Sequence, residues 1–127
     1  MPIVLHLIPA ADWDGLDATD AVTNPSLASE GFIHCTDEPS VMLQVANAFY
    51  ASVSGEFVVL HIDVDRLSSE CVWEDPAHIA GGGESFAPQF PHIYGAIDRA
   101  AIVGVQPVRR DAMGRFVGYD DTEPAAD

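Results

Sequence analysis

Lysine is absent from this chain, and basic residues of any kind are scarce. Five basic residues face 20 acidic ones in 127 residues, which gives a formal net charge of -15 at pH 7. A protein that binds nucleic acid through its phosphates needs a clustered basic surface, so this composition excludes nucleic acid as a partner. The missing lysine also excludes Schiff-base chemistry and the lysine of a phosphate-binding loop. The five basic residues are all arginines: Arg66, Arg99, Arg109, Arg110 and Arg115.

Cysteines and long apolar runs are scarce as well. Cys35 and Cys71 are the two cysteines, too few for a disulfide framework, and neither belongs to a CxxC pair. The first residues lack a positively charged segment and turn polar after about ten residues, which is typical of neither a signal peptide nor a membrane span. We therefore expect a cytoplasmic protein with no membrane partner.

The overall composition is that of a single folded domain. Hydrophobic residues make up 48% of the chain and charged residues 20%, which is ordinary for a globular protein. We predict one domain over residues 1–119, since the chain is long enough to bury a real core but not to form two domains. Residues 120–127 read DDTEPAAD, and this acidic tail is predicted to be disordered.

The stretch from Glu30 to Tyr50 contains signals for a turn, a strand and a helix in succession. Gly31 permits a turn, residues 32–35 are expected to form a short strand, and Thr36 is expected to cap an amphipathic helix over about residues 37–51. In an extended segment His34 and Thr36 point to the same side, at the open junction of strand and helix. A histidine at such a place is also often a structural residue, so this stretch alone supports both interpretations.

Several further strands are predicted. Residues 3–8 indicate an inner strand covered on both faces, with His6 beside Val4 and Ile8. The strongest strand signal covers residues 57–64, followed by a short strand at residues 71–74 and a last one from residue 100 that extends past Pro107 as an edge. Residues 10–16 favour a short helix and residues 17–29 a loop. The pattern predicts an α+β fold with a mixed or antiparallel sheet.

The segment after Pro91 carries the second candidate group of polar side chains. His92 and Tyr94 alternate with Ile93, so the imidazole and the phenol should project together. If this pair converges with His34 and Thr36, two imidazoles and two hydroxyls surround one small-molecule pocket. Such a set can hold ribose hydroxyls, or one imidazole can act as a general base. The groups capable of proton transfer or sugar recognition are His6, His34, Glu74, Glu84, His92 and Tyr94.

Four separated motifs, LHLIPAADW, EGFIHCT, VWE and FPHIYG, resemble the small bacterial family called domain of unknown function 952, over roughly residues 3–106. The family has no established reaction and is grouped by fold with the ADP-ribosyltransferases. Its motifs fall on His6, Trp13, Gly31, His34, Thr36, Glu74, Pro91, His92, Tyr94 and Gly95.

The resemblance implies an ADP-ribosyltransferase-like fold and a site for a nucleotide- or ribose-containing small molecule, with NAD as a candidate substrate. His34-Cys35-Thr36 is similar to the motif that holds the nicotinamide ribose, and Tyr94 to the tyrosine that stacks on nicotinamide. The glutamate that orients the ribose corresponds to Glu74 or Glu84, and these two stay open. The implied catalytic residues are Glu74, Glu84 and His92, and the implied ligand-binding residues are His6, His34, Thr36, Ser85, His92 and Tyr94.

Two other functions remain open at this point. The same pocket can serve a non-catalytic ligand-sensing or interaction module. His6, His34 and His92 can also be combined into a three-histidine zinc site of a hydrolase, although no HxH or HxxxH spacing supports it. We therefore expect no metal, and the oligomeric state does not follow from the sequence.

Overall fold

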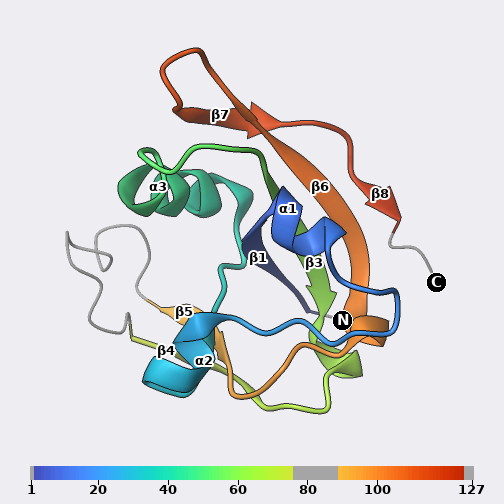
Figure 1. Cartoon of the computed structure of the whole chain (residues 1–127). Helices are drawn as coiled ribbons and strands as arrows, with labels where there is room; N and C mark the ends of the chain where they lie inside the picture. The colour runs from blue at the N-terminus through green and yellow to red at the C-terminus, as the bar shows by residue number, and fades with distance from the viewer. Residues whose placement is uncertain (1, 76–88, 125–127) are drawn as a thin grey trace.

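Two antiparallel sheets form the fold, as the computed structural model of residues 2–75 and 89–124 shows (Figure 1). The larger sheet runs β1-β3-β6-β7, with β8 also paired to β6, and the smaller sheet runs β2-β5-β4. Every strand pair in the described residues is antiparallel. This agrees with the predicted α+β class. The strands are β1 (Ile3–Pro9), β2 (Ile33–His34), β3 (Phe57–Asp63), β4 (Cys71–Glu74), β5 (Phe90–Ile93), β6 (Ile102–Arg110), β7 (Phe116–Tyr119) and β8 (Glu123–Pro124).

Short helices fill the connections between the strands. The described residues contain α1 (Ala10–Asp14), α2 (Pro25–Glu30) and α3 (Pro39–Phe49), with 3-10 turns at Val64–Arg66 and Arg99–Ala101. None of these helices is long and apolar enough to cross a membrane.

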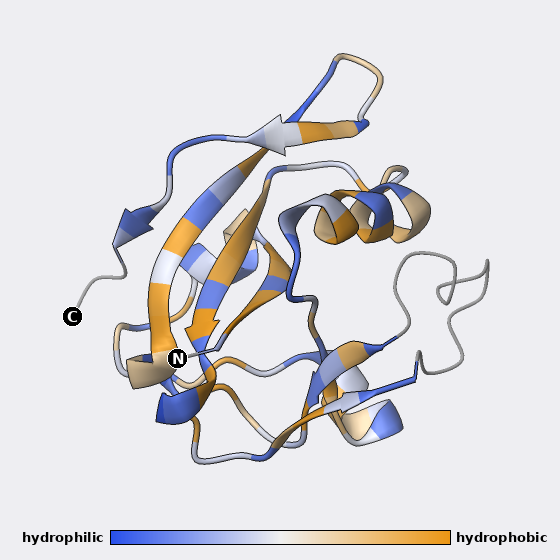
Figure 2. Cartoon of the chain, turned by 180° about the vertical axis from the view of Figure 1, so that it is seen from behind, coloured by the Kyte–Doolittle hydropathy of each residue, from blue (hydrophilic) through white to orange (hydrophobic). Residues whose placement is uncertain are grey.

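The larger sheet separates two hydrophobic cores. Its strands carry the hydrophobic colour over much of their length in Figure 2, while β8 is hydrophilic. Alternate residues of a strand face opposite sides, so Leu60 packs into one core and Val59 into the other. The first core lies against the smaller sheet, where Ile33 and Ile93 are fully buried, and the second lies against α3 through Met42.

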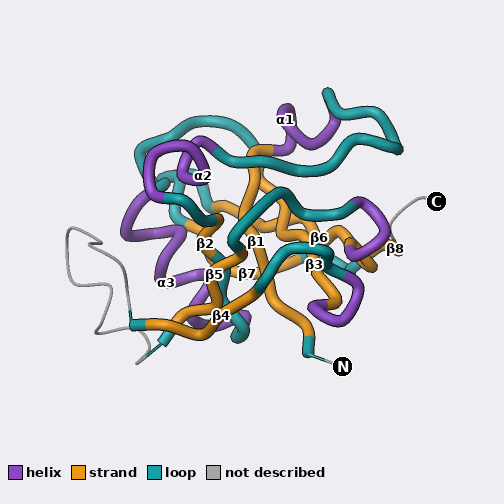
Figure 3. The backbone as a smooth tube through the Cα atoms, turned by 90° about the horizontal axis from the view of Figure 1, so that it is seen from below, coloured by secondary structure: helices purple, strands orange, loops and turns teal. Residues whose placement is uncertain are grey.

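The smaller sheet lies across one side of the molecule, with β5 between β2 and β4 (Figure 3). It is joined to β1 by an isolated antiparallel bridge between Leu5 and Thr36. The backbone N–H of Leu5 donates to the Thr36 carbonyl at 2.6 Å, and the N–H of Thr36 donates to the Leu5 carbonyl at 2.9 Å.

The predicted start of α3 is wrong. Thr36 does not cap the helix, because its backbone is used in the bridge to Leu5, and α3 begins only at Pro39 with Glu38 in the capping position. Proline is favoured in the first turn of a helix, where its missing N–H costs nothing. The helix is therefore shorter at both ends than the predicted range of about 37–51, since it ends at Phe49.

Part of the predicted loop at residues 17–29 is helical. Asn24 caps α2 by accepting a hydrogen bond from the backbone N–H of Ser26, and Pro25 occupies the first helical position. Gly31 ends this helix with a left-handed backbone, φ 91°. The Asn-Pro pair therefore marks a helix start rather than a turn alone.

One strand position differs from the prediction. β1 is buried on both faces as expected, but it lies at the edge of its sheet rather than inside it. β6 is an inner strand up to Pro107, where its pairing with β3 ends, and residues 108–110 pair with β7 alone, in agreement with the predicted edge. Glu123 and Pro124 of the acidic tail form β8, and residues 125–127 lie outside the described part of the chain.

Asn47 fastens α3 to β7. Its side-chain amide donates to the Phe116 carbonyl at 2.9 Å and accepts from the Phe116 N–H at 2.7 Å.

We expect Asn47→Ala to lower the free energy of unfolding by about 1–3 kcal/mol, because it leaves two partly buried backbone groups without partners. Urea denaturation measures the change. The exposed Gln44→Ala on the same helix is the control and should change it by less than about 0.5 kcal/mol. Equal effects of the two substitutions would contradict this role.

Candidate functional site

The smaller sheet brings His34 and His92 together. They are direct partners across β2 and β5, and their ring centroids lie 5.4 Å apart with the ring planes nearly perpendicular, at 82°. The two segments that the sequence analysis expected to converge therefore do so. His92 is buried, with 1% of its surface exposed, whereas His34 is half-exposed.

Phe32 supports both imidazoles. Its ring stacks on His92 at a centroid distance of 4.1 Å and meets His34 edge to face at 4.9 Å. Tyr94 lies 5.4 Å from the same ring. Phe32 was not predicted as a site residue, although its position two residues before His34 in an extended segment could have indicated a shared face.

Glu74 links the buried histidine to the exposed tyrosine. Its Oε1 accepts a hydrogen bond from Nδ1 of His92 at 2.8 Å and another from the Tyr94 hydroxyl. The hydrogen bond from Tyr94, followed by that from His92, lowers the pKa of Glu74. The same carboxylate raises the pKa of Tyr94, because ionised tyrosine loses its donor and gains a like-charged neighbour. Glu74 is thus held as a carboxylate by two hydrogen-bond donors.

His6 reaches the site from β1. Its Nδ1 lies 2.9 Å from the backbone carbonyl of His34, so this side chain joins the larger sheet to the smaller one. Burial lowers the pKa of His6, since the charged form would lose its hydration. A carbonyl only accepts hydrogen bonds, so the neutral His6 ring carries its proton on Nδ1.

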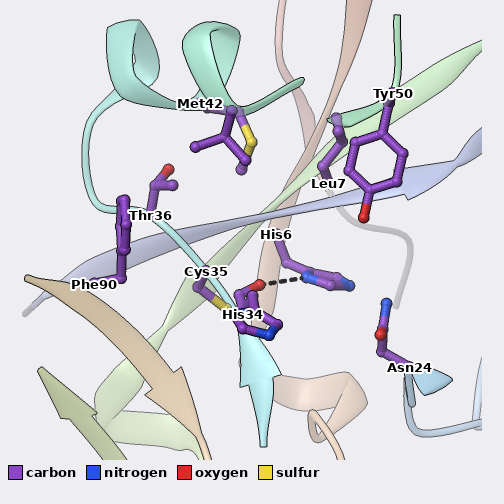
Figure 4. Close-up of a pocket in the computed structure, with 10 residues that line it drawn as sticks. His6, Leu7, Asn24, His34, Cys35, Thr36, Met42, Tyr50 and Phe90 are labelled. Carbon is purple, nitrogen blue, oxygen red and sulfur yellow. Dashed lines mark hydrogen bonds between the residues drawn. The ribbon is translucent and has the colours of Figure 1, made fainter. Parts of the chain in front are cut away.

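A pocket lies between β1, the end of α3 and the segment 34–36 (Figure 4). Its volume is about 70 Å³. Most of its wall is apolar, and the polar ends of His6, Asn24 and Tyr50 point toward one region of it in Figure 4. No Asp, Glu, Lys or Arg is among the described residues that line it. The lining residues are His6, Leu7, Asn24, His34, Cys35, Thr36, Met42, Val45, Tyr50 and Phe90.

The predicted site residues divide into two groups around His34. His6, His34 and Thr36 line the pocket. His92, Glu74 and Tyr94 form the hydrogen-bonded group beside it, and His34 contacts both. Glu84 and Ser85 lie outside the described residues.

Sequence reasoning missed Asn24, Tyr50 and Phe90 as lining residues. Asn24 could have been found as a helix cap with a free amide nitrogen. Tyr50 could have been found as a phenol at the end of α3. Phe90 carried no signal beyond its hydrophobicity.

The two thiols are not activated as nucleophiles. Burial raises the pKa of Cys35 well above its ordinary value, and it raises the pKa of Cys71 to about 11. Within residues 2–75 and 89–124, no group of three or more His, Cys, Asp or Glu side chains is placed to hold a metal ion. His6, His34 and His92 lie near one another, but His6 and His92 direct their Nδ1 atoms to protein acceptors.

The fold and the site define a small α+β protein of two antiparallel sheets with a pocket at their junction. The chain belongs to the family described as "Protein of unknown function (DUF952)", whose sequence pattern matches residues 7–105. A comparison with curated protein sequences finds no match.

Solved structures share this fold. The crystal structure of protein CC0527 from Caulobacter crescentus has a TM-score of 0.70 and 20% sequence identity, with 91% of this chain and 93% of that chain covered. The solution NMR structure of CC0527 has a TM-score of 0.64 and 19% identity, over 90% of each chain. A structure named EcPltA has a TM-score of 0.61 and 14% identity, over 98% of this chain and 86% of that one. At these identities the likeness concerns the fold alone.

The lowered pKa of His6 predicts a loss of stability in acid. As the pH falls below 6.5, the ordinary value for histidine, the unfolded chain takes up a proton that the buried ring does not, so the free energy of unfolding decreases. One such group contributes a slope of at most about 1.4 kcal/mol per pH unit. Urea denaturation at pH 7.5 and 5.5 measures it. His6→Asn should reduce the difference in the free energy of unfolding between pH 7.5 and pH 5.5. The control His61→Asn leaves His6 in place and should keep its contribution to that difference. If His6→Asn leaves the difference unchanged, the assignment to His6 is wrong.

The hydrogen bond to Glu74 predicts the titration of Tyr94. Glu74→Gln removes the negative charge but keeps an acceptor, so the pKa of Tyr94 should fall toward its ordinary value of 10.0. The ring-carbon NMR signals of labelled tyrosine followed against pH measure this. Tyr119, whose pKa burial raises to about 12, is the internal control and should not move. A Tyr94 titration that is the same in both proteins would show that the bond is not made in solution.

Proposed function

We propose that this protein binds a nucleotide- or ribose-containing small molecule at the His34 pocket, on an ADP-ribosyltransferase-like fold, with NAD as the first candidate ligand. Nε2 of His34 lies 3.0 Å from Oε2 of Glu30, so His34 hydrogen-bonds the ribose through Nδ1, together with the Thr36 hydroxyl. His92, Tyr94 and Glu74 complete the site on the far side of the His34 ring. The observation that carries the proposal is the position of His34, which lines the pocket and also packs against the His92–Glu74 pair.

The character of the pocket supports a small organic ligand. Ligand sites are commonly apolar hollows with a few placed polar groups. Here the mostly apolar wall is interrupted by the polar groups of His6, Asn24, His34, Thr36 and Tyr50. The volume of about 70 Å³ is smaller than the few hundred Å³ of most such sites. The pocket therefore receives one part of the ligand, and the rest lies outside it along the half-exposed His34.

The group around Glu74 supports a catalytic use of the same site. A carboxylate that is ionised and fixed by two donors can stabilise the positive charge that develops on a ribose ring when its glycosidic bond breaks. Only Oε1 of Glu74 is engaged by the described residues, so Oε2 remains to accept a ribose hydroxyl. The activity proposed on this basis is transfer or hydrolysis of an ADP-ribosyl or other glycosyl group.

A second candidate, a ligand sensor without catalysis, is favoured by the burial of His92. This side chain is 1% exposed and is not among the residues that line the pocket, so it cannot touch a bound ligand without rearrangement. Proton NMR of NAD incubated with the protein distinguishes the two functions. Release of free nicotinamide indicates catalysis, whereas an unchanged NAD spectrum together with measurable binding indicates a sensor.

Thr36→Val tests the binding site with little change in shape. Calorimetry with NAD, ADP-ribose and nicotinamide should show binding of at least one of them to the original protein. Loss of the Thr36 hydroxyl should weaken the ribose-containing ligands about tenfold, as expected for one buried hydrogen bond. Thr19→Val changes an exposed threonine in the same way and is the control. Absence of heat for all three compounds would count against the proposed function.

A further inference from the structure

Two buried polar atoms have no hydrogen-bond partner among the described residues, Nε2 of His6 and Nε2 of His92. Buried polar groups are nearly always paired, so each such atom calls for an explanation. His6 is 3% exposed and lines the pocket, with the free edge of its ring turned toward Asn24 and Tyr50 in Figure 4. Its unpaired nitrogen points to the side of the pocket formed by Asn24 and Tyr50, and because less than 1 Å² of this atom is exposed, a ligand donor reaches it only when one of these side chains shifts.

The chemical character of this nitrogen is fixed by the opposite side of the ring. Nδ1 of His6 lies 2.9 Å from the His34 carbonyl, which only accepts, so Nδ1 carries the proton. In the neutral ring Nε2 is then a bare lone pair, and it accepts a hydrogen bond. Whatever occupies the pocket beside His6 must present an N–H or O–H donor.

Asn24 supplies a hydrogen-bond donor to the same pocket. Its Oδ1 accepts the backbone N–H of Ser26 at 2.9 Å as the cap of α2, and this bond distinguishes the oxygen of the amide from its nitrogen. The Nδ2 group is therefore the end that Figure 4 shows turned toward the pocket, and it donates. The pocket thus offers an acceptor on His6 and a donor on Asn24, beside the Tyr50 hydroxyl, which can donate or accept.

The remaining wall suits an uncharged flat group. Leu7, Met42, Val45 and Phe90 are apolar, and the described lining residues include no arginine. Four of the five arginines are engaged elsewhere. Arg99 donates to the carbonyls of Asp17 and Asp20, Arg110 donates to backbone carbonyls around residues 50–55 and 114, Arg66 pairs with Asp63, and Arg109 pairs with Asp120. Among the described lining residues there is therefore no cation to neutralise a phosphate.

We propose that the His6 pocket binds the amide edge of an uncharged ring, with the N–H of that edge on Nε2 of His6 and its C=O on Nδ2 of Asn24. A ring carboxamide and the lactam of a nucleobase share this edge. The proposal rests on the proposed function and adds to it, because it assigns the ring of the ligand, rather than its ribose or phosphates, to the interior of the pocket.

Two matched pairs of small probes test the proposal by NMR chemical-shift titration of the full chain. Nicotinamide is compared with nicotinate, and uracil with 1,3-dimethyluracil, which separates the carboxamide source from the lactam source. At least one amide probe should bind, and its partner, which lacks the N–H donor, should bind at least about tenfold more weakly. A nicotinate that binds as well as nicotinamide, together with no preference for uracil, would overturn the proposal.

Asn24→Asp is the informative variant, because aspartate keeps the cap of α2 and replaces the donor by a charged acceptor. It should weaken the amide probe about tenfold or more. Gln44→Glu adds the same charge at an exposed position of α3 and should leave binding unchanged. An unaltered affinity in Asn24→Asp would refute the contact. A long-range proton–nitrogen NMR spectrum gives an independent check, since a His6 proton found on Nε2 would also refute the proposal.

The same titrations separate this inference from the proposed function. If NAD or ADP-ribose binds and none of the four ring probes does, the ring assignment is wrong and the ribose site stands. If neither the nucleotides nor the ring probes bind, both are wrong.

Discussion

The candidate site depends on how the two sheets are joined. β1 is connected to the segment 34–36 by two backbone hydrogen bonds between Leu5 and Thr36 and by one side-chain hydrogen bond from His6 to the carbonyl of His34. Because the N–H and C=O of Thr36 are used by β1, the chain stays extended there and places His34, Cys35 and Thr36 along the edge of β1. The pocket is the space left beside this connection, and its shape follows from it.

Local sequence signals predicted most elements but not all of their ends. The apolar run at residues 57–63 and the alternation before Tyr94 are strong local patterns, and both became strands. Thr36 has the preference of a helix cap, yet a long-range contact with Leu5 decided its conformation, and local propensity is only a weak guide when such a contact competes. The Asn24-Pro25 start of α2 was readable as a cap followed by proline, but the short polar helix gave no periodic pattern.

The site was predictable where it lies within one strand and unpredictable where it depends on pairing. Two-residue spacing placed His92 with Tyr94 correctly, and the structure adds Glu74 as the acceptor that both share. His34 lies opposite His92 because β2 pairs with β5 in this register. This register cannot be read from either segment alone, since the two strands are far apart in the sequence. The same holds for Asn24 and Tyr50, which reach the pocket from helix ends whose positions the core determines.

The division of the interior by the larger sheet bears on which substitutions this fold tolerates. The core under α3 contains Met42, Phe57 and Phe116, and Met42 also lines the pocket, while the other core supports the smaller sheet that carries His34 and His92. Core residues that do not line the pocket, such as Phe116, are constrained mainly by volume, since hydrophobic residues of similar size exchange readily. The fold therefore accommodates very different sequences, as the TM-score of 0.70 with CC0527 at 20% identity illustrates. Changes to the polar residues of the smaller sheet would then leave the packing of Phe57 and Phe116 beneath α3 in place.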